Sequence, residues 1–293
     1  MKIAVASGKG GTGKTTIATN LAWIAARNGL GVAYIDCDVE EPNGHLFLKP
    51  HMTVMRAIGQ LHPVVDDQKW AHCGLCGDIC QYSAIVCVGD KVLVYPELCH
   101  ACGGCTLVCR PGAITEVLRE TGKLEAGMAG PIHFVHGVLN IGEAMSTPLI
   151  RQVKAEPMGE ELRIIDCPPG TSCPVIESVR DADIVLLVTE PTPFGLNDLA
   201  LAVEMVRAME LPFAVLINRA DVGDRKMQEY CRPEGIEILA EIPDDRRVAE
   251  AYSRGKLACE EVPEFRRSLE ELLVQLWAAD KAAPSKGTLE AAR

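Results

Sequence analysis

The sequence predicts an α/β fold with a mostly parallel, doubly wound sheet, interrupted by a small inserted α+β domain. Short apolar runs typical of strands alternate with segments of helical periodicity. A glycine-rich loop stands at the first strand-to-helix turn, and a cysteine-rich stretch breaks the alternation between residues 62 and 118. Alternating strands and helices are typical of a parallel sheet covered on both faces.

The elements of the predicted sheet follow one another along the chain. Strands are expected at 2–7, 32–36, 162–166, 183–190, 213–218 and 236–243. Helices are expected at 15–28, 197–209 and 263–280. The first two strands and the first helix form a βαβ unit with the glycine loop at its first turn. The last helix mixes Glu and Arg on its polar face, so its apolar face is expected to pack on the core rather than on a membrane.

Composition and charge exclude several classes of protein. The 293 residues are 48% hydrophobic and 24% charged, as in globular proteins. A formal net charge of −11 and a pI near 5.2 argue against a nucleic-acid partner, which would require a basic face. No apolar run approaches the roughly 18 residues of a spanning helix. The start of the chain lacks a signal peptide's apolar core, so we expect a cytoplasmic protein without membrane insertion.

The loop SGKGGTGKTT, residues 7–16, matches two phosphate-binding fingerprints. Gly8, Gly10 and Gly13 spell the dinucleotide pattern G-x-G-x-x-G, whereas Gly8, Gly13, Lys14 and Thr15 spell the P-loop G-x-x-x-x-G-K-T. Only the P-loop requires the Lys-Thr pair. There the lysine reaches the β- and γ-phosphates, and the threonine hydroxyl binds Mg²⁺. The phosphates would be held by the loop amides at the helix N-terminus, which belong to Gly8, Lys9, Gly10, Gly11, Thr12, Gly13, Lys14, Thr15 and Thr16.

The dinucleotide interpretation has its own support, because an acid some twenty residues after the loop binds the ribose in such folds. Asp36 and Asp38 both meet that condition. An oxidoreductase that binds a dinucleotide is therefore an alternative, against which Lys14 and Thr15 argue.

Lys9 has no place in either fingerprint. With it, GKGGTGKT resembles the deviant P-loop of the MinD/ParA group of ATPases, which includes the nitrogenase iron protein and the Mrp-type cluster carriers. The resemblance implies ATP or ADP as ligand and a homodimer, or a heterodimer with a related ATPase, across the nucleotide face. In that group the extra lysine reaches the partner's nucleotide. A second ammonium at the phosphates would stabilise charge in the transition state.

Two further segments resemble the switches of that group. YIDCDVEEPN, residues 34–43, resembles switch I, which implies that Asp38 orients the attacking water and that Asp36 supports it. IIDCPPGT, residues 164–171, resembles the Walker B and switch II segment. This implies that Asp166 holds Mg²⁺ through water and that the amide of Gly170 senses the γ-phosphate. The implied catalytic residues are Lys9, Lys14, Asp38 and Asp166.

The resemblance also extends to the base site. LINR, residues 216–219, implies that Asn218 reads the adenine. IPDD, residues 242–245, implies a loop with Pro243 and Asp244 that packs on the base. Residues 1–61 and 119–281 would then form the P-loop ATPase domain, with a ferredoxin-like iron–sulfur domain inserted at 62–118 and a flexible tail at 282–293.

The insert contains the cysteine run CHACGGCTLVC, which has the C-x2-C-x2-C-x3-C spacing of bacterial ferredoxins and is followed by Pro111. Zinc is the competing metal, but its sites usually use two separated C-x2-C pairs. Disulfides are not expected in a cytosolic chain. The run therefore favours iron–sulfur ligation by Cys99, Cys102, Cys105 and Cys109.

The upstream run CGLCGDIC supplies only the last three positions of the same pattern, with Trp70 at the first. In two-cluster ferredoxins the fourth cysteine of each run ligates the other cluster. One 4Fe–4S cluster would then be complete, and a second would have three ligands. Three alternatives are open for the second centre. It is a 3Fe–4S cluster, it recruits Cys87 or His72 as a fourth ligand, or it does not form. The first set is Cys80, Cys99, Cys102 and Cys105, and the second is Cys73, Cys76 and Cys109.

These patterns predict a Mg-ATP-dependent ATPase of the MinD superfamily that couples nucleotide binding to an iron–sulfur cluster. Its output would be electron transfer to a redox partner, or assembly or transfer of a cluster to an accepting protein. The alternative is a ParA/MinD-like nucleotide switch for positioning, with a structural iron–sulfur insert. Cys173, after switch II, is either apolar filler or the counterpart of a cluster-binding cysteine in the nitrogenase iron protein.

Overall fold

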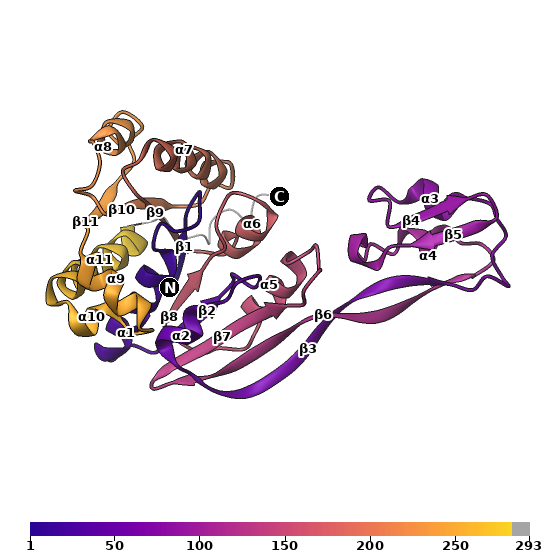
Figure 1. Ribbon diagram of the computed structural model, residues 1–293, viewed down its shortest axis with the longest axis horizontal. Coiled ribbons are helices and arrows are strands. Elements are labelled where there is room, and N and C mark those ends of the chain that lie inside the picture. The colour runs from indigo at the N-terminus through magenta and orange to yellow at the C-terminus, as the bar shows by residue number, and fades with distance from the viewer. Residues whose placement is uncertain (283–293) are drawn as a thin grey trace.

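The computed structural model describes residues 1–282 and contains one large sheet with helices on both faces (Figure 1). The nine strands lie in the order β11-β10-β9-β1-β8-β2-β7-β6-β3. The strands from β11 to β7 are parallel, and β6 and β3 extend the sheet antiparallel at one edge. The predicted α/β class with a mostly parallel sheet is confirmed. Its strands are β1 (Lys2–Ala6), β2 (Val32–Asp36), β3 (His51–Val65), β6 (Ile114–Ala129), β7 (Ile132–Leu139), β8 (Leu162–Asp166), β9 (Ile184–Thr189), β10 (Phe213–Asn218) and β11 (Ile238–Ile242).

The two faces of the sheet bury separate apolar cores. One core joins the sheet to α1 (Lys14–Arg27), α10 (Ala258–Glu261) and α11 (Pro263–Ala282). The other joins it to α5 (Thr147–Lys154), α6 (Cys173–Val179), α7 (Pro193–Ala208) and α8 (Lys226–Cys231). Two further helices, α2 (Gly44–Leu48) and α9 (Arg246–Ser253), add Phe47, Leu48 and Ala251 to the first core. Across residues 1–282, none of the helices is both long enough and apolar enough to pass through a lipid bilayer.

Two predicted helices can be compared with the structure in detail. The apolar face of α11 packs into the core as predicted, because Phe265 is 4% exposed and Leu269 is fully buried. The start of α7 was predicted at residue 197 but lies at Pro193. The side chain of Thr192 accepts a hydrogen bond from the Gly195 amide, at 2.9 Å, and a proline occupies the first turn. Both features favour a helix start, so the helix begins earlier.

The outer halves of β3 and β6 leave the sheet as a two-stranded ribbon (Figure 1). Strand β7 pairs with residues 122–129 of β6 only. Residues 59–65 of β3 and 114–121 of β6 therefore pair only with each other, and we call them the arm. A register irregularity lies between Ile58 and Gly59, where the arm begins.

The arm carries residues 66–113, which we call the cysteine lobe (Figure 1). The lobe contains α3 (Leu75–Ile79), the hairpin of β4 (Ile85–Val88) and β5 (Lys91–Val94), a 3-10 turn at Pro96–Leu98 and α4 (Gly104–Val108). The predicted insert, 62–118, includes this lobe and the outer end of the arm. The predicted tail, 282–293, lies outside the described residues except for Ala282, the last residue of α11.

Candidate functional site

The loop between β1 and α1 depends on glycine at two positions. A Cβ on Gly8 would lie 2.1 Å from the carbonyl oxygen of Asp198. Gly13, the N-cap of α1, has a φ of 95°, in the left-handed region. Lys14 follows as the first helical residue and is 7% exposed. The loop amides and this ammonium therefore surround the N-terminus of α1, where the helix dipole favours an anion.

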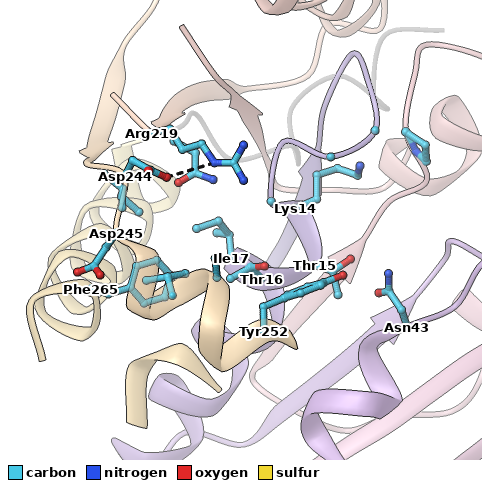
Figure 2. A pocket seen from close by; sticks show the side chains of 18 of the residues that line it. Lys14, Thr15, Thr16, Ile17, Asn43, Arg219, Asp244, Asp245, Tyr252 and Phe265 are labelled. Atoms are coloured by element: carbon cyan, nitrogen blue, oxygen red, sulfur yellow. Dashed lines mark ion pairs between the residues drawn. The ribbon is translucent and has the colours of Figure 1, made fainter. Parts of the chain in front are cut away.

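A cavity of about 390 Å³ opens beside this loop (Figure 2). Figure 2 shows Lys14 and Thr15 on the loop side, with Tyr252 and Phe265 on the wall formed by α9 and α11. The size suits a small-molecule ligand. The predicted site residues that line it are Gly10, Gly11, Gly13, Lys14, Thr15, Thr16, Asp38, Asn218, Pro243 and Asp244.

Asp166, at the end of β8, lies beside Thr15 at the foot of the loop. The Tyr34 hydroxyl donates a hydrogen bond to Asp166 Oδ2 at 2.8 Å, whereas Asp166 Oδ1 is buried without a partner among the described atoms. Burial raises the pKa of Asp166, and the nearby Thr15 side chain and Lys14 ammonium oppose that rise. A hydroxyl beside an unpartnered carboxylate oxygen fits a hard cation such as Mg²⁺.

The two acids of the switch I segment have different surroundings. Asp36 is buried, and its carboxylate accepts hydrogen bonds from the Gly44 amide at 3.0 Å and the Asp38 amide at 3.1 Å. It therefore holds the backbone of the segment, which agrees with a supporting role. Asp38 lines the cavity, where burial and then the nearby Asp166 raise the pKa of Asp38 to about 6. A carboxylate with this pKa is suited to general acid–base work near neutral pH.

Lys9 lies away from the cavity. Its ammonium pairs with Glu190 at the end of β9 in the same chain. A Glu190 carboxylate oxygen also lies 3.5 Å from one guanidinium nitrogen of Arg219. Another guanidinium nitrogen of Arg219 lies 3.5 Å from the Asp244 carboxylate. In this structure the extra lysine is therefore held by its own chain.

Two other predicted residues also make contacts within the chain. The Asn218 side chain donates a hydrogen bond to the Thr12 carbonyl at 2.9 Å, so it braces the loop as well as lining the cavity. The Gly170 amide donates to the Ser7 carbonyl at 2.9 Å. Gly8, Lys9, Thr12, Asp166 and Gly170 do not line the cavity.

Other residues that line the cavity belong to segments the sequence singled out without assigning them a role. Glu41 and Asn43 lie in the switch I segment, Pro169 in the switch II segment, Arg219 in LINR, and Ile242 and Asp245 in IPDD.

Five lining residues lie outside every predicted motif. They come from separate helices, and no motif links them in the sequence. These residues are Ile17, Val248, Ala249, Tyr252 and Phe265.

In the cysteine lobe, the predicted first ligand set lies together. Burial raises the pKa of Cys99, and the neighbouring Cys102 and Cys80 thiols add to that rise. Burial also raises the pKa of Cys105, and Cys99 contributes there. Burial also acts to raise the pKa of Cys80. Hydrogen bonds from the backbone amides of residues 82–85 outweigh this effect, so the pKa of Cys80 is lowered. The lobe therefore brings these four thiols near one another.

All thirteen cysteines are free thiols. Within residues 1–282, no three His, Cys, Asp or Glu side chains converge as the ligands of a single metal ion do. An iron–sulfur cluster keeps its thiolates farther apart than one ion does, because the inorganic core stands between them. Backbone amides donate to these sulfurs, from Ala101 to Cys99 at 3.4 Å and from Ala113 to Cys109 at 3.3 Å. Neighbouring thiols with amide donors fit the donor set of such a cluster.

Comparisons with known proteins agree with this fold and this loop. The family described as the CobQ/CobB/MinD/ParA nucleotide binding domain matches residues 3–258. An uncharacterized protein of Methanocaldococcus jannaschii is 33% identical over 280 residues, which cover 94% of this chain and 96% of that protein. An iron-sulfur cluster carrier protein of Pyrococcus furiosus is 25% identical over 272 residues, which cover 87% of this chain and 77% of that protein.

Among solved structures, the septum site-determining protein MinD of Pyrococcus horikoshii, complexed with Mg-ADP, superposes with a TM-score of 0.57. It is 20% identical, and the match covers 97% of this chain and 99% of that one. At this identity the likeness concerns the fold. Because the family match includes the loop, both switch segments and most of the sheet, the chain belongs to the CobQ/CobB/MinD/ParA nucleotide-binding family.

Proposed function

We propose that the protein is a Mg-ATP-dependent ATPase that couples nucleotide binding and hydrolysis to an iron–sulfur cluster in the cysteine lobe. The observation that carries the proposal is the arm. Strand β6 runs without a break from the sheet, where it pairs with β7, to Ile114 beside the thiols. One continuous element therefore joins the part of the chain that holds the nucleotide loop to the part that holds the cysteines.

The cavity residues have the chemistry that phosphoryl transfer requires. Lys14 and the loop amides would hold the β- and γ-phosphates, and Thr15 and Asp166 would hold Mg²⁺, which neutralises developing charge on the phosphates when bound. The Asp38 carboxylate would orient the attacking water. Tyr252, Phe265 and Pro243 offer an apolar wall for the base.

A face-to-face dimer would complete the site. Lys9 is held by Glu190 in the single chain, and its side chain is 28% exposed. In the dimer it would leave this partner and reach the partner subunit's nucleotide, where a second ammonium stabilises transition-state charge. ATP would favour the closed dimer, and hydrolysis would release it.

The first cluster would be held by Cys80, Cys99, Cys102 and Cys105. When bound, a 4Fe–4S cluster supplies one-electron chemistry or is itself the cargo. Cys99 lines a narrow cleft together with Arg119 of β6 and Glu143 of the loop before α5. The Arg119 guanidinium makes two hydrogen bonds to Glu143, at 2.9 and 2.6 Å. This contact ties the arm to the loop before α5 at the cleft that Cys99 also lines.

The name of the Pyrococcus furiosus relative, an iron-sulfur cluster carrier protein, supports cluster transfer as one output. Electron delivery to a redox protein is the other. The two differ in whether iron leaves the chain. Incubation with an iron-free acceptor protein, followed by separation and iron analysis, distinguishes them.

The experiment uses protein purified without oxygen. We expect a brown protein with iron and sulfide, and ATP turnover that falls steeply in Lys14→Ala. The matched control is Lys226→Ala, which removes an exposed lysine paired with Asp224. Electron paramagnetic resonance of the reduced protein, with and without Mg-ATP, tests the coupling. Spectra that are identical in both conditions would contradict it. Full ATP turnover in a brown protein whose spectra do not respond to Mg-ATP would instead favour a positioning switch with a structural iron–sulfur insert.

A further inference from the structure

The cysteine lobe contains two copies of one backbone pattern, residues 70–87 and residues 99–116. Each copy has a residue with positive φ before its second ligand position, His72 at 54° and Ala101 at 53°. A left-handed glycine then caps a five-residue helix, Gly74 before α3 and Gly103 before α4. In both copies the alanine and isoleucine that follow the helix are buried. The two copies can therefore be compared position by position.

In this comparison Trp70 takes the place of Cys99, the first ligand of the complete set. Trp70 is 7% exposed, and its indole N–H is buried without a hydrogen-bond partner among the described atoms. Burial and the neighbouring Cys87 raise the pKa of the Cys76 thiol, and the nearby Trp70 indole opposes that rise. A buried donor is costly unless it has an acceptor, and the Cys76 sulfur lies close to the indole. The indole N–H therefore faces a ligand sulfur of this site.

Cys87, on β4, has Glu116 as its counterpart in the second copy. The Cys87 sulfur lies 3.6 Å from the Cys76 sulfur and 3.9 Å from the Gly74 carbonyl oxygen. Two sulfurs at 3.6 Å are too close to bind different irons of one cluster, so the two side chains would rotate apart as the cluster binds. In the other copy the Glu116 carboxylate comes within 3.7 Å of a Cβ built on Gly103 and acts electrostatically on Cys99. In both copies this strand position therefore lies near the left-handed glycine and near a ligand position, the third in one copy and the first in the other.

Two thiols of the incomplete set, together with Cys87, lie at the buried centre of the lobe. Cys76 forms this centre with Ile85 and Ile114, and Cys87 and Cys109 pack against it, as do Cys80 and Cys105 of the first set. Cys73 is exposed, like its counterpart Cys102 in the complete set. Each set thus combines one exposed thiol with thiols that are buried or half-buried.

We propose that Cys87 replaces the ligand missing at Trp70, so that Cys73, Cys76, Cys87 and Cys109 hold a second 4Fe–4S cluster. The inference rests on the proposed function, because it assumes that the lobe binds iron and sulfide. Each thiol loses its proton to solvent as its sulfur binds an iron atom. The indole N–H of Trp70 donates to a sulfur of this cluster, as amide N–H groups do at other iron–sulfur sites.

His72 is the rival ligand. Its side chain is exposed, and its ring centroid lies 4.4 Å from that of Trp70. The two rings are tilted by 52° to each other. The exposed imidazole is not part of the buried centre of the lobe, whereas Cys87 packs against that centre. His72→Ala is therefore a matched control for Cys87→Ala.

The test reconstitutes the full chain with ferric iron, sulfide and a thiol reductant under argon, and the thiol supplies the electrons that the cluster requires. Iron is counted per chain, and electron paramagnetic resonance is recorded in the oxidised and reduced states. We expect two 4Fe–4S clusters in the wild type and in His72→Ala. In Cys87→Ala we expect the loss of about one iron in eight and the oxidised-state signal of a 3Fe–4S cluster. Cys87→Ser, which keeps an oxygen ligand, should retain four irons at this centre with a changed spectrum.

Cys80→Ala serves as a reference, because it removes a ligand of the first cluster only. The inference is overturned if the wild type holds one cluster that Cys80→Ala alters and Cys87→Ala does not. A 3Fe–4S signal already present in the wild type, and unchanged in Cys87→Ala, also overturns it. The proposed function survives both results. An iron-free lobe in every sample would instead overturn the proposed function.

Discussion

Removal of the Glu190 carboxylate should strengthen the ATP-dependent dimer. The Lys9 and Glu190 side chains that form the ion pair are 28% and 14% exposed. A pair of this exposure contributes about 1 kcal/mol. A face-to-face dimer breaks two such pairs, one in each chain, which costs about 2 kcal/mol. Glu190→Gln should therefore lower the dimer dissociation constant about 30-fold, since about 1.4 kcal/mol corresponds to a factor of ten.

Sedimentation velocity with saturating Mg-ATP measures this constant. The Asp38→Asn background prevents consumption of the nucleotide during the run. Glu204→Gln, an exposed acid on α7, is the charge-matched control and should leave the constant unchanged. The gain should disappear in the double variant Lys9→Ala/Glu190→Gln. A Glu190→Gln dimer no tighter than the wild type would show that Lys9 is not held back by its own chain.

Three further changes test the site. Asp38 acts in its ionised form, and its pKa is raised to about 6. The value of kcat/KM for ATP should therefore fall about tenfold for each pH unit below about 6. Asp38→Asn should have a low rate that does not change with pH in this range. Gly8→Ala places a Cβ 2.1 Å from the Asp198 carbonyl oxygen in α7 and should lower the free energy of unfolding in urea by about 1–3 kcal/mol. Gly10→Ala should change this free energy little, because no atom lies within 4 Å of a Cβ at that position. Tyr34→Phe leaves the buried carboxylate of Asp166 without its 2.8 Å partner and should lower the free energy of unfolding by about 1–3 kcal/mol; an unchanged denaturant midpoint would contradict this.

The parallel core of the sheet was predictable because its strands are buried on both faces. Such strands appear as continuous apolar runs, as in FAVLIN of β10, and each predicted strand lies within two residues of an observed one. The arm was not predicted. Its strands are mostly exposed or half-buried, and a segment such as LRETGK in β6 has no apolar face that would produce a pattern. Strand β7 was missed although its centre is buried, since three histidine and glycine residues interrupt its apolar run.

The nucleotide loop was predictable for a different reason. Its function depends on residues spaced closely along the chain, so the spacing of Lys14 and Thr15 after the glycines is sufficient to identify it. The pairing of Lys9 with Glu190 joins residues far apart in the sequence, and no local pattern encodes it. The same is true of Tyr252 and Phe265, which the fold brings to the cavity from separate helices.

The arm has a mechanical consequence. At a rise of about 3.4 Å per residue, its residues 114–121 extend about 27 Å beyond the sheet. The register irregularity at Ile58 and Gly59 lies at its base, and a Cβ on Gly59 would be 2.5 Å from the Arg119 carbonyl oxygen. Such an irregularity interrupts the hydrogen-bond ladder and allows the strand to bend at that point. A rotation of about 10° there would swing the far end by about 5 Å, so the ribbon would act as a lever that amplifies a small tilt at its base.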